Sequence, residues 1–253
     1  MAKLLSLFIW IREQIQAFGA WLTELYQPIG AWLKAQIGDT PYLLFVSTFE
    51  TIYMTFTATF FACLIGIPLG VALYATRPGR FLQNRLVHYP LGIIVNIGRS
   101  IPYIILALSI IPLTRLITGT SIGNTAAIVP LTISAVPFIA RMVENMLNEV
   151  PGGLIEAAQA MGASPRHIIG KVLLPEAKPG LINAITITLI ALIGYSAIAG
   201  ALGANGLGKI AYNYGHLRYQ REIMISTICI IVVLVQIVQW IGDGMAKRAD
   251  HRH

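Results

Sequence analysis

The sequence predicts an all-α, polytopic membrane protein with five transmembrane helices and an amphipathic helix at its N-terminus. Hydrophobic residues make up 56% of the 253 residues and charged residues only 11%, whereas soluble domains carry about 25% charged residues. Uncharged apolar stretches long enough to cross a bilayer recur along the chain. The charges gather between them, so the net charge of +7 indicates cytoplasmic loops rather than a surface for nucleic acid.

Residues 1–40 differ from the rest of the chain. Their apolar residues recur at alternating spacings of four and three, which places them on one helix face: Leu4, Phe8, Ile11, Ile15, Phe18, Leu22 and Leu25. Pro28 interrupts the pattern, and Ile29 and Trp32 resume it. A spanning helix would bring Arg12 and Glu13 into the bilayer, at roughly 2.5–3.5 kcal/mol per charge at the helix centre. We therefore expect an interfacial helix. A sixth span and a helix packed on the protein are the alternatives, and the missing cleavage site argues against a signal peptide.

The first predicted span covers residues 51–76. It contains Gly66 and Gly70, a small-residue spacing that lets helices approach closely, and Pro68, which predicts a kink. A basic loop and a short helix near the membrane interface, over residues 86–98, follow it.

Four further spans are predicted at residues 99–115, 122–140, 181–203 and 223–241. Arg141 and Glu144 follow the third span three residues apart, so they can form an ion pair on one helix face. Residues 203–208 read as a glycine-rich turn before an aromatic polar loop at 212–219. Cys63 and Cys229 lie inside spans, where small core residues are expected rather than a disulfide. The sequence has no Gly-rich phosphate loop and no His/Cys cluster, so neither an ATPase nor a metal site is predicted.

The most polar stretch, residues 156–175, predicts a helical hairpin within residues 151–178. Pro151 suits the first turn of one helix, and Gly162 suits its left-handed end. Ser164 and Pro165 supply an N-cap and a first-turn proline for a second helix, which Pro175 is expected to stop.

The span at 181–203 is the best candidate to line a polar path, because polar residues inside a bundle usually face its interior. The candidates are Asn183, Thr186, Tyr195 and Ser196. Ordinary hydrogen bonds between helices are the alternative for these residues. Residues 51–76, 122–140, 181–203 and 223–241 contain no Asp, Glu, Lys, Arg or His, which argues against a proton- or sodium-coupled carrier.

The hairpin resembles the EAA loop of ABC importer permeases, which docks on the cytoplasmic ATPase. The resemblance rests on the spacing of Glu156-Ala157-Ala158, Gly162 and Leu174-Pro175, with Met161, Ser164 and Pro165 in the turn. The family pattern has isoleucine two residues before the leucine, where this chain has Val172.

Over residues 41–250 the chain is similar to the permease subunit of bacterial methionine importers. The runs that carry the similarity are 98–102, 127–131, 137–145, 154–158, 173–177, 187–190 and 194–196. The similarity implies the type I importer fold and a path for D- or L-methionine across the cytoplasmic membrane. It also implies a homodimer in membrane lipid with an extracytoplasmic methionine-binding protein. Two separate ATPase subunits would use ATP and Mg, so this chain would bind no cofactor and catalyse no reaction. Residues 1–40 depart from the short N-terminus of that family.

The charge distribution supports a topology with the N-terminus outside and the C-terminus inside. If the hairpin is cytoplasmic, eleven of the 18 Lys and Arg residues lie inside and seven outside. Two other functions fit the sequence: an ABC permease for another amino acid or small solute, and a membrane scaffold without transport.

Overall fold

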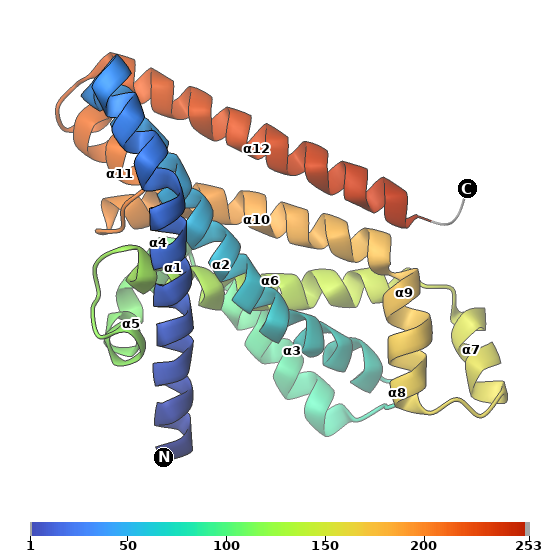
Figure 1. Cartoon of the computed structure of the whole chain (residues 1–253). Helices are drawn as coiled ribbons and strands as arrows, with labels where there is room; N and C mark the ends of the chain where they lie inside the picture. Colours follow the sequence, from blue (N-terminus) through green and yellow to red (C-terminus); the bar gives the residue numbers. More distant parts are fainter. Residues whose placement is uncertain (1, 251–253) are drawn as a thin grey trace. The chain divides into compact units, whose positions relative to one another are not determined.

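The computed structural model describes residues 2–250, so His251 and His253 lie outside the described part of the chain. Within that part the chain is helical, without strands (Figure 1). The α-helices are α1 Ala2–Ile37, α2 Asp39–Thr76, α3 Arg85–Ser100, α4 Tyr103–Ser109, α5 Ile111–Thr118, α6 Asn124–Asn148, α7 Gly152–Ala160, α8 Pro165–His167, α9 Leu174–Glu176, α10 Lys178–Ala201, α11 Leu207–Ile210 and α12 Arg221–Ala249. Two π-helices, η1 Ile168–Leu173 and η2 Ala211–His216, lie between them.

Four of the described helices, α2, α6, α10 and α12, are long and apolar enough to cross a membrane. The number rises to five if α3 and α4 form one broken span, since they meet at a bend of 103°. The predicted all-α fold with five spans is therefore confirmed, but the second span was predicted wrongly as one helix over 99–115. Ile101 is extended (φ −83°, ψ 120°) because Pro102 disfavours the helical conformation of the residue before it. A second break falls at Ile110.

The chain divides into two compact units, and the four helices α2, α6, α10 and α12 each contribute to both. Unit 1 comprises the chain up to Ala58, Pro102–Thr132 and Ala191–Gln236. Unit 2 comprises Thr59–Ile101, Ile133–Ile190 and the chain from Ile237 onward.

In unit 1, α1 packs antiparallel against the first half of α2. The Tyr53 hydroxyl donates to the carbonyl of Ile15 at 2.8 Å, and the rings of Tyr26 and Phe49 stack with centroids 5.2 Å apart. The helix continues through Pro28, and α1 is not among the described helices that could span a membrane. It nevertheless leaves Trp10, Trp21 and other large apolar residues exposed. Among its described residues, α1 therefore packs against α2 along one face and exposes large apolar side chains elsewhere, and its interfacial position stays a prediction.

The predicted turn at 203–208 lies in unit 1 and is bound to α2 and α6. The N–H of Gly206 donates to Glu50 Oε2 at 3.0 Å, and the N–H of Leu207 donates to Thr51 Oγ1 at 2.9 Å. Asn124 of α6 accepts from the N–H of Asn205 at 2.8 Å and donates to Glu50 Oε1 at 3.3 Å. Glu50 belongs to α2, which begins at Asp39 rather than at the predicted residue 51.

In unit 2, the predicted close approach of helices occurs between α2 and α6. A Cβ atom on Gly66 would lie 2.9 Å from Ile139 Cβ, and one on Gly70 would lie 2.5 Å from the carbonyl oxygen of Ala140. The predicted ion pair also forms, with 2.6 Å between Arg141 Nη1 and Glu144 Oε2. The other arm of Arg141 donates to Asn96 Oδ1 at 2.5 Å, so α6 is joined to α3.

Both cysteines are free, in agreement with the prediction. Cys63 is half-buried, whereas Cys229 is exposed on α12, so its predicted place in the core is wrong for the single chain.

Candidate functional site

The hairpin predicted from the sequence is present in unit 2, formed by α7 and by the continuous arm of α8, η1 and α9 (Figure 1). The end of α7 has the two hydrogen bonds of a Schellman motif. The N–H of Ala163 donates to the carbonyl of Ala158 at 3.0 Å, and the N–H of Gly162 donates to that of Gln159 at 2.9 Å. Gly162 has φ +77°, the left-handed conformation predicted for it.

The second arm begins as predicted. Ser164 is its N-cap and accepts a hydrogen bond from the N–H of His167 at 3.4 Å, and Pro165 occupies the first turn. Pro151, in contrast, is the N-cap of α7 with ψ 127° and does not lie in the first turn.

The prediction that Pro175 stops this arm is wrong. Pro175 lies inside α9, and the arm continues to Glu176. The π-helix η1 directly precedes it, and the N–H of Leu174 donates to Ile169, five residues back. A proline ring in an α-helix clashes with the carbonyl four residues earlier. A π-turn widens the helix at that point, so the helical arm can accommodate the ring of Pro175 and continue.

The hairpin has a buried side and a free side. Ile155, Ala158, Ile168 and Leu173 are buried and fix the two arms. Glu156, Ala157, Ser164, Pro165 and Pro175 are exposed, and Met161 is 81% exposed at the tip. Leu174 is half-buried. The free side therefore combines small residues with one flexible thioether, on a backbone held by two caps.

The four candidate path residues of α10 have different environments. Thr186 and Ser196 are buried, and their hydroxyls donate within their own helix, to Ile182 at 2.9 Å and to Ile193 at 2.7 Å. Their polarity is therefore satisfied locally. Asn183 is exposed and lines a cavity of about 390 Å³ in unit 2, together with Met142, Met146, Glu149 and others.

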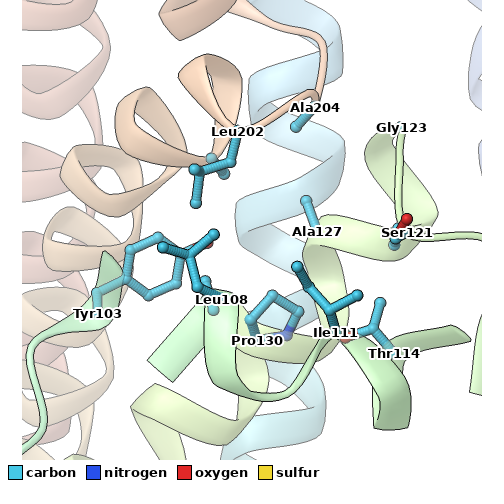
Figure 2. Close-up of a pocket in the computed structure, with 13 residues that line it drawn as sticks. Tyr103, Leu108, Ile111, Thr114, Ser121, Gly123, Ala127, Pro130, Leu202 and Ala204 are labelled. Carbon is cyan, nitrogen blue, oxygen red and sulfur yellow. The ribbon is translucent and has the colours of Figure 1, made fainter. Parts of the chain in front are cut away.

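Tyr195, in unit 1, is the fourth candidate. It is 38% exposed, and its ring stacks on that of Tyr103 with centroids 5.0 Å apart and planes 2° apart. Tyr103 opens α4 and is only 5% exposed. Figure 2 shows it beside a small cavity of about 60 Å³, which is also lined by Ile111, Thr114 and Pro130.

Sequence reasoning missed three features of these sites. Tyr103 was not singled out, and neither was the role of Glu50 at the turn 203–208. The contact of Arg141 with Asn96 was not predicted either. Each of these features depends on a contact between residues 45 or more positions apart. The periodicity of a single sequence does not indicate which distant residues come into contact.

Comparison with known proteins places this architecture in a family. A family model described as "Binding-protein-dependent transport system inner membrane component" matches residues 66–251. A probable D-methionine transport system permease protein MetI of Vibrio cholerae is 56% identical over 188 residues, 74% of this chain and 84% of the relative. The protein of the same description from Pasteurella multocida is 51% identical over 210 residues, 83% of this chain and 97% of the relative.

Solved structures agree with these relatives. A chain of the MetNI methionine ABC transporter in an inward-facing conformation matches with a TM-score of 0.82 and 54% identity, over 83% of this chain and 97% of that one. A chain of an amino acid ABC transporter solved with histidines matches with a TM-score of 0.68 at 20% identity, which supports the fold alone. The chain belongs to the family of binding-protein-dependent transport system inner membrane components.

Proposed function

We propose that this chain is the membrane subunit of an ATP-driven importer and forms the path by which methionine crosses the cytoplasmic membrane. The relatives named as D-methionine transport permeases support the substrate, with 51–56% identity over most of the chain. The single observation that carries the mechanism is the capped hairpin with its exposed face of Glu156, Ala157 and Met161.

The energy for transport comes from a partner. The acidic groups Glu50 and Glu144 lie within α2 and α6, but both are engaged: Glu50 with the turn at Gly206, and Glu144 with Arg141. Such pairing fits a structural role better than proton or sodium coupling. We propose that two separate ATPase subunits bind ATP and Mg and dock on the hairpins of two copies of this chain. A binding protein delivers methionine on the opposite side, in keeping with the family description.

The proposed topology follows from the charges. Lys and Arg gather beside the hairpin and at the end of α12, where Lys247 and Arg248 lie in the last turn, so these segments are cytoplasmic and the N-terminus is outside. Residues 41–250 are the permease domain, and residues 1–40 lie at the membrane interface, with the exposed tryptophans of α1 at the level of the lipid headgroups.

In the proposed cycle, ATP binding brings the two ATPase subunits together, and each hairpin moves with its ATPase. Because the caps hold the hairpin rigid, this motion passes to α6 and α10 at its two ends rather than melting the contact. The path between the two copies then opens outward to accept methionine and closes again after hydrolysis.

A charge at Ala157 tests this proposal. Ala157 is exposed, whereas Ala158 is 4% exposed, so Ala158→Asp would disrupt the hairpin itself. We expect Ala157→Asp to abolish methionine uptake in cells that lack their own copy of this chain, and Ala157→Ser to retain it. Both variants should reach the membrane in equal amounts, as measured by immunoblot. Normal uptake by Ala157→Asp would contradict the docking role of the hairpin.

A further inference from the structure

Tyr195 occupies an unusual place on α10. Its ring is 38% exposed, and its neighbour Gly194 has no atom within 4 Å of the position that a Cβ atom would occupy. The surface around the ring is therefore open on the side of Gly194. Asn183 and Ile187 are also exposed and lie on the same stripe of the helix as Gly194, since 4 and 11 residues are close to whole turns. Tyr195 borders this stripe.

The composition of this stripe does not suit lipid. On α12 most exposed positions between Ile225 and Met245 carry large apolar side chains, among them Ile228, Val232 and Ile237. Among the described residues of α10, in contrast, Ile187 and Tyr195 are the only large apolar side chains that are exposed, and the exposed stripe also carries the amide of Asn183 and Gly194. Polar groups within a span usually face the bundle interior or a water-filled path, so this stripe fits a path better than it fits a lipid surface.

The ring of Tyr195 is held in one orientation by Tyr103. The two planes are 2° from parallel and their centroids are 5.0 Å apart, while Tyr103 itself is 5% exposed. The Tyr103 hydroxyl has no hydrogen-bond partner among the described residues, so the phenol is not kept there by a polar contact within the chain. Tyr103 lies beside the small cavity, whose lining also includes the apolar residues Leu108, Ala127 and Leu202 (Figure 2). One face of the Tyr195 ring is thus used for stacking, while 38% of the residue's surface remains exposed.

We propose, on the basis of the function proposed above, that Tyr195 contacts the thioether side chain of the substrate in the translocation path and that Tyr103 is its positioning residue. Thioether sulfur atoms make favourable contacts with aromatic rings, often at the ring edge, at about 5 Å from the ring. A methylene group in place of the sulfur fills similar space without this attraction. The ring therefore favours methionine over norleucine by about two- to tenfold in the transport step.

The test uses the complete transporter, with both ATPase subunits and the binding protein, reconstituted in lipid vesicles. The binding protein is supplied saturated with methionine or with norleucine, and the ratio of the two transport rates is measured. Each variant is compared with the wild type, so selection by the binding protein cancels. We expect Tyr195→Phe to keep the wild-type ratio, and Tyr195→Leu to lower it about two- to tenfold. Tyr195→Gln serves as a second variant without a ring.

The positioning role has its own readout. Tyr103→Leu removes the stacking partner and should lower the same ratio by a smaller factor. Tyr103→Phe keeps the ring and removes only a hydroxyl without a partner in the chain, so it should retain the wild-type ratio.

Three results would overturn the inference. The first is a wild-type ratio in both Tyr195→Leu and Tyr195→Gln. The second is dissociation of the two copies in both variants, seen by light scattering, which would assign Tyr195 to the contact between copies. The third is transport of neither amino acid by the wild-type transporter, which would remove the proposed function together with the inference. A lower ratio of methionine to norleucine transport in the Tyr195 variants supports the inference, provided that these variants still assemble and hydrolyse ATP.

Discussion

The hairpin at 151–176 and the turn at 203–208 flank the same helix, α10, and look alike in the sequence. Both are polar segments punctuated by glycine, yet their surroundings differ. At the tip of the hairpin, a Cβ atom on Gly162 would meet no atom within 4 Å. In the turn segment, a Cβ atom on Gly208 would overlap the backbone of Ala197, with its carbonyl oxygen at 2.6 Å. The tip of the hairpin is therefore exposed, whereas the turn segment is packed closely against other residues of the chain.

This difference separates an exposed surface, on which we propose that the ATPase docks, from a segment that holds the fold together. The turn is held by long-range hydrogen bonds to Glu50, Thr51 and Asn124. The hairpin is held by its own caps and by a few buried apolar residues, so its outer face remains available. Substitutions in the turn should therefore act on stability, and substitutions on the hairpin surface should act on transport.

The largest effect is expected for Gly208→Ala. The added methyl group would force apart the backbones of α10 and α11, and overpacking of this kind costs about 1–3 kcal/mol or more. The unfolding temperature of the purified protein in detergent should fall clearly. Gly170→Ala, at a helical position of the hairpin with no atom within 4 Å, is the matched control and should not lower the unfolding temperature, since alanine is the better helix former. Equal unfolding temperatures for Gly208→Ala and Gly170→Ala would contradict the claim that the turn segment is closely packed and the hairpin surface is not.

Removal of the Glu50 carboxylate should have the next largest effect. Glu50→Ala leaves the N–H of Gly206 and the side-chain amide of Asn124 without their acceptor, and an unsatisfied buried donor costs about 1–3 kcal/mol. Glu50→Gln keeps one acceptor oxygen and should retain more of the stability. Thermal unfolding of the two variants beside the wild type measures this order, and a reversed order would show that the carboxylate does not hold the turn.

A smaller effect is expected at the tip of the hairpin. An alanine at position 162 must adopt φ +77°, which costs a residue other than glycine about 1–2 kcal/mol. Gly162→Ala should weaken co-purification of the ATPase and lower the unfolding temperature of the purified protein less than Gly208→Ala does. Gly162→Asn, which tolerates the left-handed conformation better, should be closer to the wild type. If alanine and asparagine behave identically, backbone strain is not the cause.

The sequence predicted local features well. The end of α7 at Gly162, the cap at Ser164, the Arg141–Glu144 pair and the close approach at Gly66 and Gly70 all follow from residues a few positions apart. In each case, short-range geometry decides the outcome.

The failures have two physical reasons: local backbone geometry at two prolines, and packing between segments far apart in the sequence. The extent of the arm beyond Pro175 depends on a π-turn that absorbs the ring, and the break at Pro102 interrupts an apolar stretch that reads as one span. Packing between distant segments determines three further features. These are the start of α2, the hydrogen bond from Gly206 to Glu50, and the stacking of Tyr103 on Tyr195. Hydrophobicity and spacing carry no information on such contacts.

The most direct test of the free hairpin surface is chemical labelling at Met161, which is 81% exposed. Met161→Cys would be introduced into a chain whose Cys63 and Cys229 are replaced by alanine. The chain would then be treated with a membrane-impermeant maleimide in inside-out vesicles, with the ATPase bound or stripped. We expect strong labelling of the introduced cysteine after the ATPase has been stripped, and protection from labelling when the ATPase is bound. Equal labelling in both states, or labelling only from the extracytoplasmic side, would contradict this expectation.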